Sequence, residues 1–370
     1  MKFLQNFLLM PLLSMAFMFA PLKISAQEVI PHDWNDKVEQ KFERDAPAEV
    51  VIWDRKVAAR ARDNPDVMRD SWANNYWLCR SETDPAVGAC STQRVWTGPP
   101  NTEIKLLFSE ARSKMTQVLA VSMLRSNGFS LRSINSSIHS AAGVVDLSAK
   151  ISANELKRLP AGGVWTASLR LVQYHQRGGG TDLGSVQVAE TNAEITLHVT
   201  DTKNVQIFLP EYNTTTPTVN LGLISQVSRA GRTTGRRDID MCLYDGFGSN
   251  SSWFDVTVKD DRSVPQRALG SFSVIRDGTS GQTPRERIDY GVTYLHNGQR
   301  TSLNNGETVR LLGGNNTDIR PVYLPNIPVP VLCKPMPLTL ETPEFNAKDK
   351  QAGSYTGKLR IIFSPSAQSL

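Results

Sequence analysis

The sequence predicts an all-β protein made of two sandwich domains in tandem. Three observations support this: apolar and polar residues alternate along many short segments, turn-forming dipeptides separate those segments, and the chain is long. Alternation with a period of two is typical of strands that bury one face. A chain of 370 residues exceeds what one hydrophobic core usually serves, so two domains are expected.

The alternation is clearest in residues 195–199, 219–223 and 359–363. Asn-Gly and Asp-Gly dipeptides, which favour tight hairpin turns, stand at Asn127-Gly128, Asp277-Gly278, Asn297-Gly298 and Asn305-Gly306. Helical patterns are scarce: residues 39–44 and 57–62 could each form a turn or two. Residues 109–124 are ambiguous between helix and strand. Many short strands with frequent turns indicate sandwiches.

The chain begins with a segment typical of a secretory signal peptide. Lys2 precedes an apolar stretch over residues 3–21, and Ile24-Ser25-Ala26 stands ahead of the polar segment that begins at Gln27. Such a segment is removed on export and takes no part in the fold. We therefore expect residues 1–26 to be a signal peptide and the mature chain to be exported and soluble.

The predicted boundary between the domains lies where a strand-like run ends at Pro210, before a polar, threonine-rich stretch. Residues 27–209 are expected to form the first domain and residues 213–370 the second. Residues 210–212 would be a short linker.

Four cysteines occur in the chain, and an exported protein meets an oxidising compartment that favours disulfides. Nearness in sequence pairs Cys79 with Cys90 and Cys242 with Cys333. Each predicted domain would then hold one disulfide. A zinc site is disfavoured because no CxxC motif occurs and no histidine stands nearby.

The composition argues against two other classes of protein. Removing Lys2 and Lys23 with the signal peptide lowers the formal net charge from +5 to +3, and the remaining basic residues are scattered among 36 acids. A nucleic-acid-binding protein usually clusters its basic residues. No GxSxG, HExxH or P-loop motif occurs, so we expect no enzyme, metal or cofactor. The remaining enzyme hypothesis, a secreted carbohydrate-active enzyme, needs two convergent carboxylates.

Several segments together resemble a known family. They are residues 155–156, 159–160, 162–165 and 204–210 in the first half, and 237–246, 249–252, 327–333 and 352–357 in the second. These segments are similar to the minor tip adhesins of class 5 (alternate chaperone-usher) fimbriae, the CFA/I and CblD-like group. The resemblance extends from about Cys79 to Leu370.

The resemblance implies two immunoglobulin-like domains, an adhesin domain followed by a pilin domain that lacks its last strand. It also implies four partners: a periplasmic chaperone, an outer-membrane usher, a major pilin subunit that donates its N-terminal strand, and a host glycan or glycoprotein receptor. No nucleic acid is implied. The chain would pass through the periplasm to the tip of a fimbrium at the cell surface.

The residues give partial, independent support for the missing strand. If residues 357–363 form the last strand, only seven residues follow, and Pro365 lacks the N–H that a ladder needs. Leu359, Ile361 and Phe363 would then line an open donor-strand groove. From the residues alone, a complete sandwich with a charged edge strand is equally compatible.

The other end of the mature chain predicts its position in a fibre. A donated strand needs an alternating apolar segment, whereas residues 27–34 contain Pro31 and lead directly into the first domain. A chain that accepts a strand but donates none belongs at the distal end.

Relatives implied by the resemblance bind host glycoconjugates through arginines on the adhesin domain. Counted from Trp165, their adjacent arginine pair falls on His175 and Gln176, with Arg177 one place later, and a further arginine falls on Asn74. We expect His175 and Arg177 to contact the receptor, together with Tyr174, whose ring could stack on a sugar. The alternatives are solvated charges at a strand end and, for the whole protein, a structural initiator without receptor binding.

Overall fold

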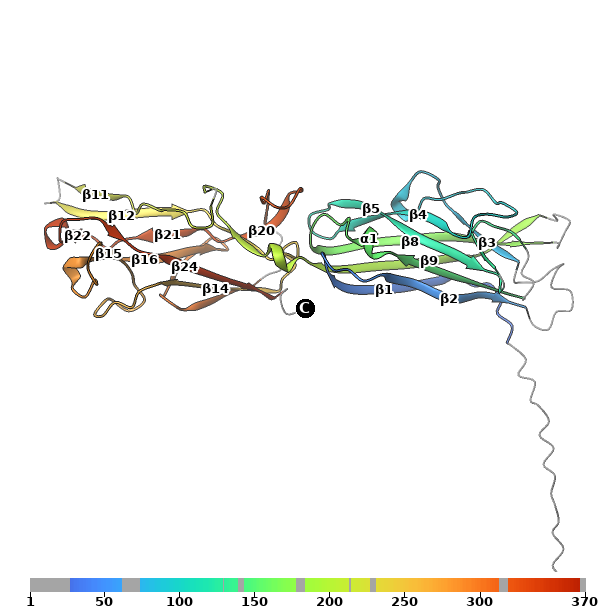
Figure 1. Ribbon diagram of the computed structural model, residues 1–370, viewed down its shortest axis with the longest axis horizontal. Helices are drawn as coiled ribbons and strands as arrows, with labels where there is room; N and C mark the ends of the chain where they lie inside the picture. The colour runs from blue at the N-terminus through green and yellow to red at the C-terminus, as the bar shows by residue number, and fades with distance from the viewer. Residues whose placement is uncertain are drawn as a thin grey trace, which may run out of the picture.

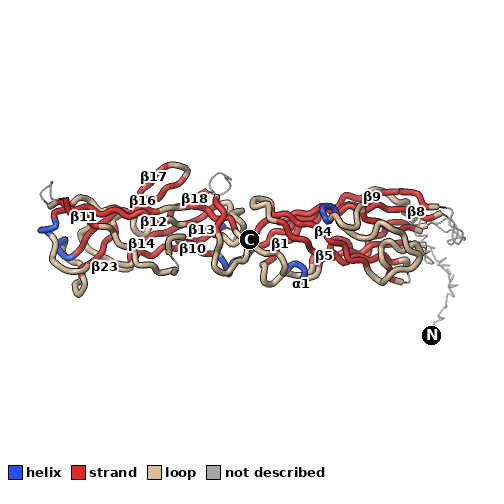
Figure 2. Tube along the Cα trace, turned by 90° about the horizontal axis from the view of Figure 1, so that it is seen from above, coloured by secondary structure: helices blue, strands red, loops and turns tan. Residues whose placement is uncertain are grey.

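The computed structural model shows two β-sandwich domains that lie end to end (Figures 1 and 2). The structure describes residues 27–61, 74–128, 130–138, 143–177, 184–212, 214–226, 231–312 and 319–366. The predicted all-β fold is confirmed. The predicted signal peptide, residues 1–26, lies outside the described residues. In the described part of the chain, no helix is long and apolar enough to cross a bilayer.

The first domain is built on one nine-stranded sheet that bends into two layers. Its strands are β1 (Trp34–Glu43), β2 (Val50–Arg60), β3 (Asn75–Cys79), β4 (Thr102–Glu110), β5 (Thr116–Ser126), β6 (Leu131–Arg132), β7 (Val144–Ile151), β8 (Gly163–Gln176) and β9 (Ser185–Thr200), and its short helices are η1 (Pro85–Val87) and α1 (Ala153–Leu156). The order is β1-β9-β8-β4-β5-β7-β2, with β3 on β8 and β6 on β5. Strand β8 joins the layers, because it pairs with β9 along its length and with β4 only near its start.

The core of the first domain is closed by its own chain. Ile195, Leu197 and Val199 of β9 are at most 1% exposed, as the alternation predicts. Trp77 and Trp165 are completely buried in the same core. Strand β9 has a neighbour on each side, β8 and the parallel strand β1.

The helical turns expected near the start of the chain are strands. Residues 39–43 lie in β1 and residues 57–60 in β2, each paired with a long partner strand. Residues 109–124, which were ambiguous, span the end of β4, a turn and most of β5. Sheet pairing decides these segments because local helix propensity is weak compared with tertiary contacts.

The second domain contains two main facing sheets and a smaller sheet near the first domain. Its elements are η2 (Thr202–Asn204), β10 (Gln206–Phe208), β11 (Leu223–Gln226), β12 (Arg232–Ile239), β13 (Cys242–Tyr244), β14 (Trp253–Asp260), β15 (Phe272–Arg276), η4 (Pro284–Glu286), β16 (Arg287–His296), β17 (Gln299–Leu303), β18 (Thr308–Leu312), β19 (Arg320–Val322), β20 (Val331–Pro335), β21 (Leu338–Glu341), β22 (Phe345–Asn346), η6 (Ala347–Asp349), β23 (Tyr355–Thr356) and β24 (Leu359–Pro365). One main sheet has the order β11-β12-β21-β16-β15-β23, and the other is β18-β14-β24. The smaller sheet has the order β10-β13-β20-β19.

The chain enters the second domain earlier than the predicted linker at residues 210–212. Strand β10 was expected to end the first domain, but it pairs antiparallel with β13 in the second. The passage between the sheets therefore lies before Gln206. The partner of β10 is more than thirty residues away in sequence, so local pattern could not assign it.

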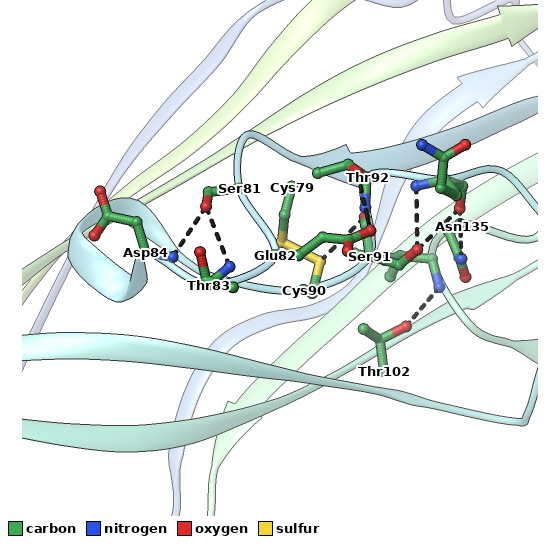
Figure 3. Close-up of a disulfide and its surroundings, with 12 residues drawn as sticks. Cys79, Ser81, Glu82, Thr83, Asp84, Cys90, Ser91, Thr92, Thr102 and Asn135 are labelled. Carbon is green, nitrogen blue, oxygen red and sulfur yellow. Dashed lines mark hydrogen bonds between the residues drawn. A yellow bond between two sulfur atoms is a disulfide. The ribbon is translucent and has the colours of Figure 1, made fainter.

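Both predicted disulfides are present. Cys79 and Cys90 are bonded with Cα atoms 5.3 Å apart, and Cys242 and Cys333 with Cα atoms 5.8 Å apart. Figure 3 shows the hydrogen bonds of polar groups in and beside the short loop that the Cys79–Cys90 disulfide closes. Ser81 Oγ accepts the N–H of Asp84 at 2.9 Å, and Glu82 Oε1 accepts the N–H of Thr92 at 3.1 Å.

The two domains meet in a close, partly polar junction. The N–H of Asp201 donates to the carbonyl of Gly246 at 2.8 Å. Completely buried Glu110 accepts from Asn250 Nδ2 at 3.2 Å. The backbones approach so closely that a Cβ on Gly162 would lie 2.0 Å from the Gly246 carbonyl oxygen. Gly162, Gly246 and Asn250, which belong to segments that carried the resemblance in sequence, thus lie at this junction.

Candidate functional site

The first candidate site is the outer edge of β24, the last strand of the second domain. On one side β24 pairs antiparallel with β14 over its full length, from Leu359 opposite Asp260 to Pro365 opposite Phe254. In the order β18-β14-β24 it is an end strand, so no described strand pairs with its other side. A row of backbone N–H and C=O groups is therefore open to a further strand.

The inward side chains of β24 are only half covered. Leu359, Ile361 and Phe363 are half-buried and pack against the core of the domain. The ring of Phe363 stacks on the ring of Phe254, with centroids 6.0 Å apart. By contrast, Phe254 itself is 1% exposed. The core residue under β24 is therefore fully buried, whereas the inward side chains of β24 itself are only partly covered.

A second row of half-buried apolar residues packs against the same core, from β10 and the segment that follows it. This row consists of Ile207, Leu209, Tyr212, Val219 and Leu221. Residues 217–222 alternate between half-buried and exposed, as in a strand, yet belong to no strand of the described structure. We name the half-covered apolar surface formed by Leu359, Ile361 and Phe363 along the unpaired edge of β24 the open groove.

The second candidate site is the distal pole of the first domain, at the end of β8. The ring of Tyr174 stacks on that of Tyr76, with centroids 5.5 Å apart and planes inclined by 11°. Arg177 is exposed, and its N–H donates to the carbonyl of Gly184 at 3.0 Å. His175 is only 5% exposed, since β3 runs beside it with Asn75 in register. Direct contact with a ligand would thus be left to Arg177 and Tyr174.

The same pole contains a buried arginine that sequence reasoning missed, because no local pattern marks it. Arg125 is completely buried and donates to the carbonyls of Ser136 and Ile138. Burial, together with the charge of Arg132, lowers the pKa of Arg125 to about 9. Because its donors are directed at loop carbonyls, Arg125 holds the loops of the pole rather than facing solvent.

The described residues contain no group of three or more His, Cys, Asp or Glu side chains that could hold a metal ion. The two candidate sites offer two kinds of contact: strand pairing at the open groove, and polar and aromatic contacts at the pole.

Comparison with known proteins decides the family. The sequence profile for the first domain of CfaE, a CFA/I fimbrial protein, matches residues 24–202, and that for its second domain matches residues 205–367. The chain belongs to the CfaE family of CFA/I fimbrial proteins. The resemblance stated from the sequence is thereby confirmed.

Individual relatives cover most of the chain. The CFA/I fimbrial protein CfaE of Escherichia coli is 32% identical over 311 residues, which are 80% of this chain and 81% of that protein. The crystal structure of CfaE, the adhesive subunit of the CFA/I fimbria of enterotoxigenic E. coli, matches with a TM-score of 0.77 and 27% identity. The match covers 93% of this chain and 95% of the CfaE chain. A chain from a chaperone–tip adhesin complex of CFA/I fimbriae biogenesis matches with a TM-score of 0.63 and 25% identity, over 92% of this chain and 98% of that one.

The second domain of the present protein is an incomplete pilin domain that lacks its last strand.

Proposed function

We propose that this protein is the tip subunit of a chaperone–usher fimbrium, where it starts assembly by accepting a donor strand and adheres to host glycoconjugates. The observation that carries the proposal is the open groove, with its unpaired β24 edge and half-covered Leu359, Ile361 and Phe363. Its relatives are named as a fimbrial adhesive subunit and as part of a chaperone–tip adhesin complex.

A strand from another chain would complete the second domain by β-augmentation. Its backbone would pair with β24, and its alternate side chains would cover the apolar surface. Full burial of an aliphatic or aromatic side chain stabilises by roughly 1.5–3 kcal/mol. Because Leu359, Ile361 and Phe363 are already half covered, each would gain part of that amount. The edge hydrogen bonds would add to it.

The proposed partners use the groove in succession. A periplasmic chaperone would fill it first and prevent aggregation through the exposed edge. At the outer-membrane usher, the N-terminal strand of a major pilin would replace the chaperone. The protein would then stand at the cell surface, at the tip of the fimbrium.

The first described residues support the tip position, since they are tied into their own domain. Val29 and Arg60 exchange two backbone hydrogen bonds of 2.9 and 2.8 Å. Trp34, at the start of β1, is 3% exposed and packs edge-on against Trp53. A segment held in this way is not available to complete a neighbouring subunit.

Adhesion is assigned to the distal pole, with Arg177 and Tyr174 as proposed contacts and His175 beneath them. An arginine fork can donate to a carboxylate or to sugar hydroxyls. This surface lies at the opposite end of the first domain from the junction, because β8 begins at the junction and ends at the pole (Figure 1).

The assembly function is tested by fusing the N-terminal strand of the major pilin, through a flexible linker, after Leu370. We expect the fused protein to be monomeric and its second domain to melt at least about 10 °C higher than in the unfused chain, given 2–4 °C per kcal/mol for a domain of this size. An unchanged oligomeric state and melting temperature would contradict strand acceptance.

The adhesion function is tested with Arg177→Ala in the fused protein, measured as binding to receptor-bearing cells. We expect a loss of about 10-fold, as for one charge-assisted hydrogen bond. The matched control is Lys157→Ala, an exposed cation at the junction end of the same domain. If neither the wild type nor any variant binds cells while fibres still assemble, the protein is a structural initiator without receptor binding.

A further inference from the structure

An open pocket of about 370 Å³ lies on the outer face of the first domain, over strands β2, β5 and β7. Its walls include Arg55, Leu124, Ser126, Leu131, Asp146 and Ser148. The volume is within the range of small-molecule sites. None of these residues belongs to the open groove or to the proposed contacts at the end of β8.

The pocket residues come from the outward positions of ordinary strands. In β7, Leu147 and Ala149 are completely buried in the core, so Asp146 and Ser148 point to the other side of the sheet. A carboxylate on the outer face of a sheet is normally hydrated. Asp146 is instead only 3% exposed, because Gly128, Ser130 and Leu131 line the pocket beside it.

Asp146 has an incomplete set of hydrogen-bond partners. Its Oδ1 atom is buried and accepts no hydrogen bond from any described residue. Its Oδ2 atom lies 3.8 Å from a guanidinium nitrogen of Arg55, whose side chain is 72% exposed. Burial raises the pKa of Asp146, and Arg55 and Ser126 offset this only in part. A buried acceptor without a donor is costly, and Asp146 forms part of the wall of a pocket large enough for a ligand.

Arg55 is held over the pocket by a distorted backbone. Its φ of 45° lies in the left-handed region, which costs free energy for a residue with a side chain. Strand β2 is irregular around it, with register shifts between Val51 and Trp53, between Trp53 and Lys56, and between Val57 and Ala59. The N–H of Arg55 donates to Ser148 Oγ at 3.0 Å. Bulges and unusual backbone angles of this kind often direct a side chain toward a binding site.

We propose that this pocket binds one neutral pyranose residue of a glycan. A sugar hydroxyl would donate to the carboxylate of Asp146, and the guanidinium of Arg55 would donate to a neighbouring hydroxyl or ring oxygen. Leu124 and Leu131, the latter 51% exposed, would cover the C–H face of the ring. One carboxylate and one guanidinium leave the site close to neutral, which favours an uncharged ligand over an ion.

This inference rests on the proposed adhesive function and places a glycan contact away from Arg177. The pocket is nevertheless near the distal pole: β5 starts close to the junction and ends at Ser126, in the pocket wall. A glycan chain could therefore reach it from outside the fibre.

The experiment uses the full chain with its fused donor strand. Methyl glucoside, methyl galactoside and methyl mannoside are screened by saturation-transfer NMR, and the sugar that binds is titrated against variants. Asp146→Asn removes the carboxylate at constant shape. Arg55→Asn removes the guanidinium, and asparagine tolerates the left-handed backbone. We expect each to weaken binding about 10-fold or more, as for a hydrogen bond to a charged group.

The matched control is Lys150→Asn, which removes an exposed cation from the same face of β7, outside the pocket wall. Its affinity should stay within about 2-fold of wild type. Binding of no pyranose, or equal binding by wild type and both pocket variants, overturns the proposal. The proposed adhesive function is scored separately, because cell binding that persists in Asp146→Asn without pyranose binding refutes the pocket alone.

Discussion

The two sandwiches carry the same alternating pattern but end differently. In the first domain, the inward residues of β9 are at most 1% exposed, and β9 has a strand on each side. In the second domain, Leu359, Ile361 and Phe363 of β24 have the same spacing but are half-buried, and β24 is paired on one side. Alternation thus reveals which face of a strand is apolar. It does not reveal whether a neighbouring strand exists.

This difference in closure gives the two domains different functions. The core of the first domain is closed by its own chain. The second domain has an edge and an apolar surface that another chain must cover. Each prediction below changes one feature of this contrast.

The largest effect is expected at the open groove. Ile361→Asp should weaken capture of the donor strand by at least about 100-fold, because an unpaired carboxylate would be buried beneath the incoming strand. The adjacent Ile362 is 44% exposed and points away from the core, so Ile362→Asp is the matched control. Binding of a synthetic donor peptide, followed by fluorescence anisotropy, measures both. Equal affinities would mean that the donor does not use this face of β24.

A smaller effect separates the two disulfides. Cys242 and Cys333 are 91 residues apart and Cys79 and Cys90 only 11, so the longer loop restricts the unfolded chain more. Replacing Cys242 and Cys333 by alanine should cost about 4.5 kcal/mol, and replacing Cys79 and Cys90 about 3 kcal/mol, on the chain-entropy model. Calorimetry of the donor-fused protein measures both losses. A larger loss in the first domain would contradict this order.

The next effect concerns the junction. Gly162→Ala would bring a Cβ within 2.0 Å of the Gly246 carbonyl oxygen, so the domains must shift relative to each other. We expect a changed distance distribution between spin labels on the two domains. The melting temperature of the second domain should be nearly unchanged and that of the first lowered, because the Cβ would also lie 2.9 Å from the Val199 carbonyl oxygen. Gly291→Ala is the control, since the nearest atom to its Cβ would be 3.9 Å away. An unchanged distribution in Gly162→Ala would show that the junction absorbs the methyl group locally.

The smallest effect is a pH-dependent one at Asp146. Burial raises its pKa above the usual value of 3.8, so the folded state binds this proton more tightly than the unfolded state. Stability should therefore fall as pH rises from about 4 through the raised pKa. Asp146→Asn does not ionise and therefore does not lose this stability. Its melting temperature should be higher than that of the wild type at pH 7, and the difference in melting temperature should disappear near pH 4. Thermal melts across this range test the sign, and a variant that is less stable at pH 7 contradicts it.

Sequence reasoning was sufficient for features that depend on local pattern and compartment. The all-β fold follows from alternation and turn dipeptides, and both disulfides follow from export and spacing. The alternation at residues 359–363 marks the inward residues of β24 along the open groove. At residues 219–223 the strand prediction holds only in part, because Val219 and Leu221 are half-buried outside any strand and Leu223, which begins β11, is 44% exposed.

Features that depend on distant partners were not predictable. Strand β10 belongs to the second domain because it pairs with β13, and residues 39–43 form a strand because β9 lies beside them. His175 is buried because β3 runs beside it. The pocket at Asp146 depends on three strands and a bulge. Its only trace in the sequence is one carboxylate within the apolar run of residues 144–147.

The central claim is that the second sandwich lacks a strand that another chain supplies. Hydrogen exchange of the β24 amides tests it most directly, because those not paired with β14 have no ladder partner until a donor arrives. We predict that these amides exchange rapidly in the uncomplemented chain and slow by at least about 100-fold when a donor peptide is bound. Amides that are already protected along both edges of β24 in the free monomer would contradict the claim.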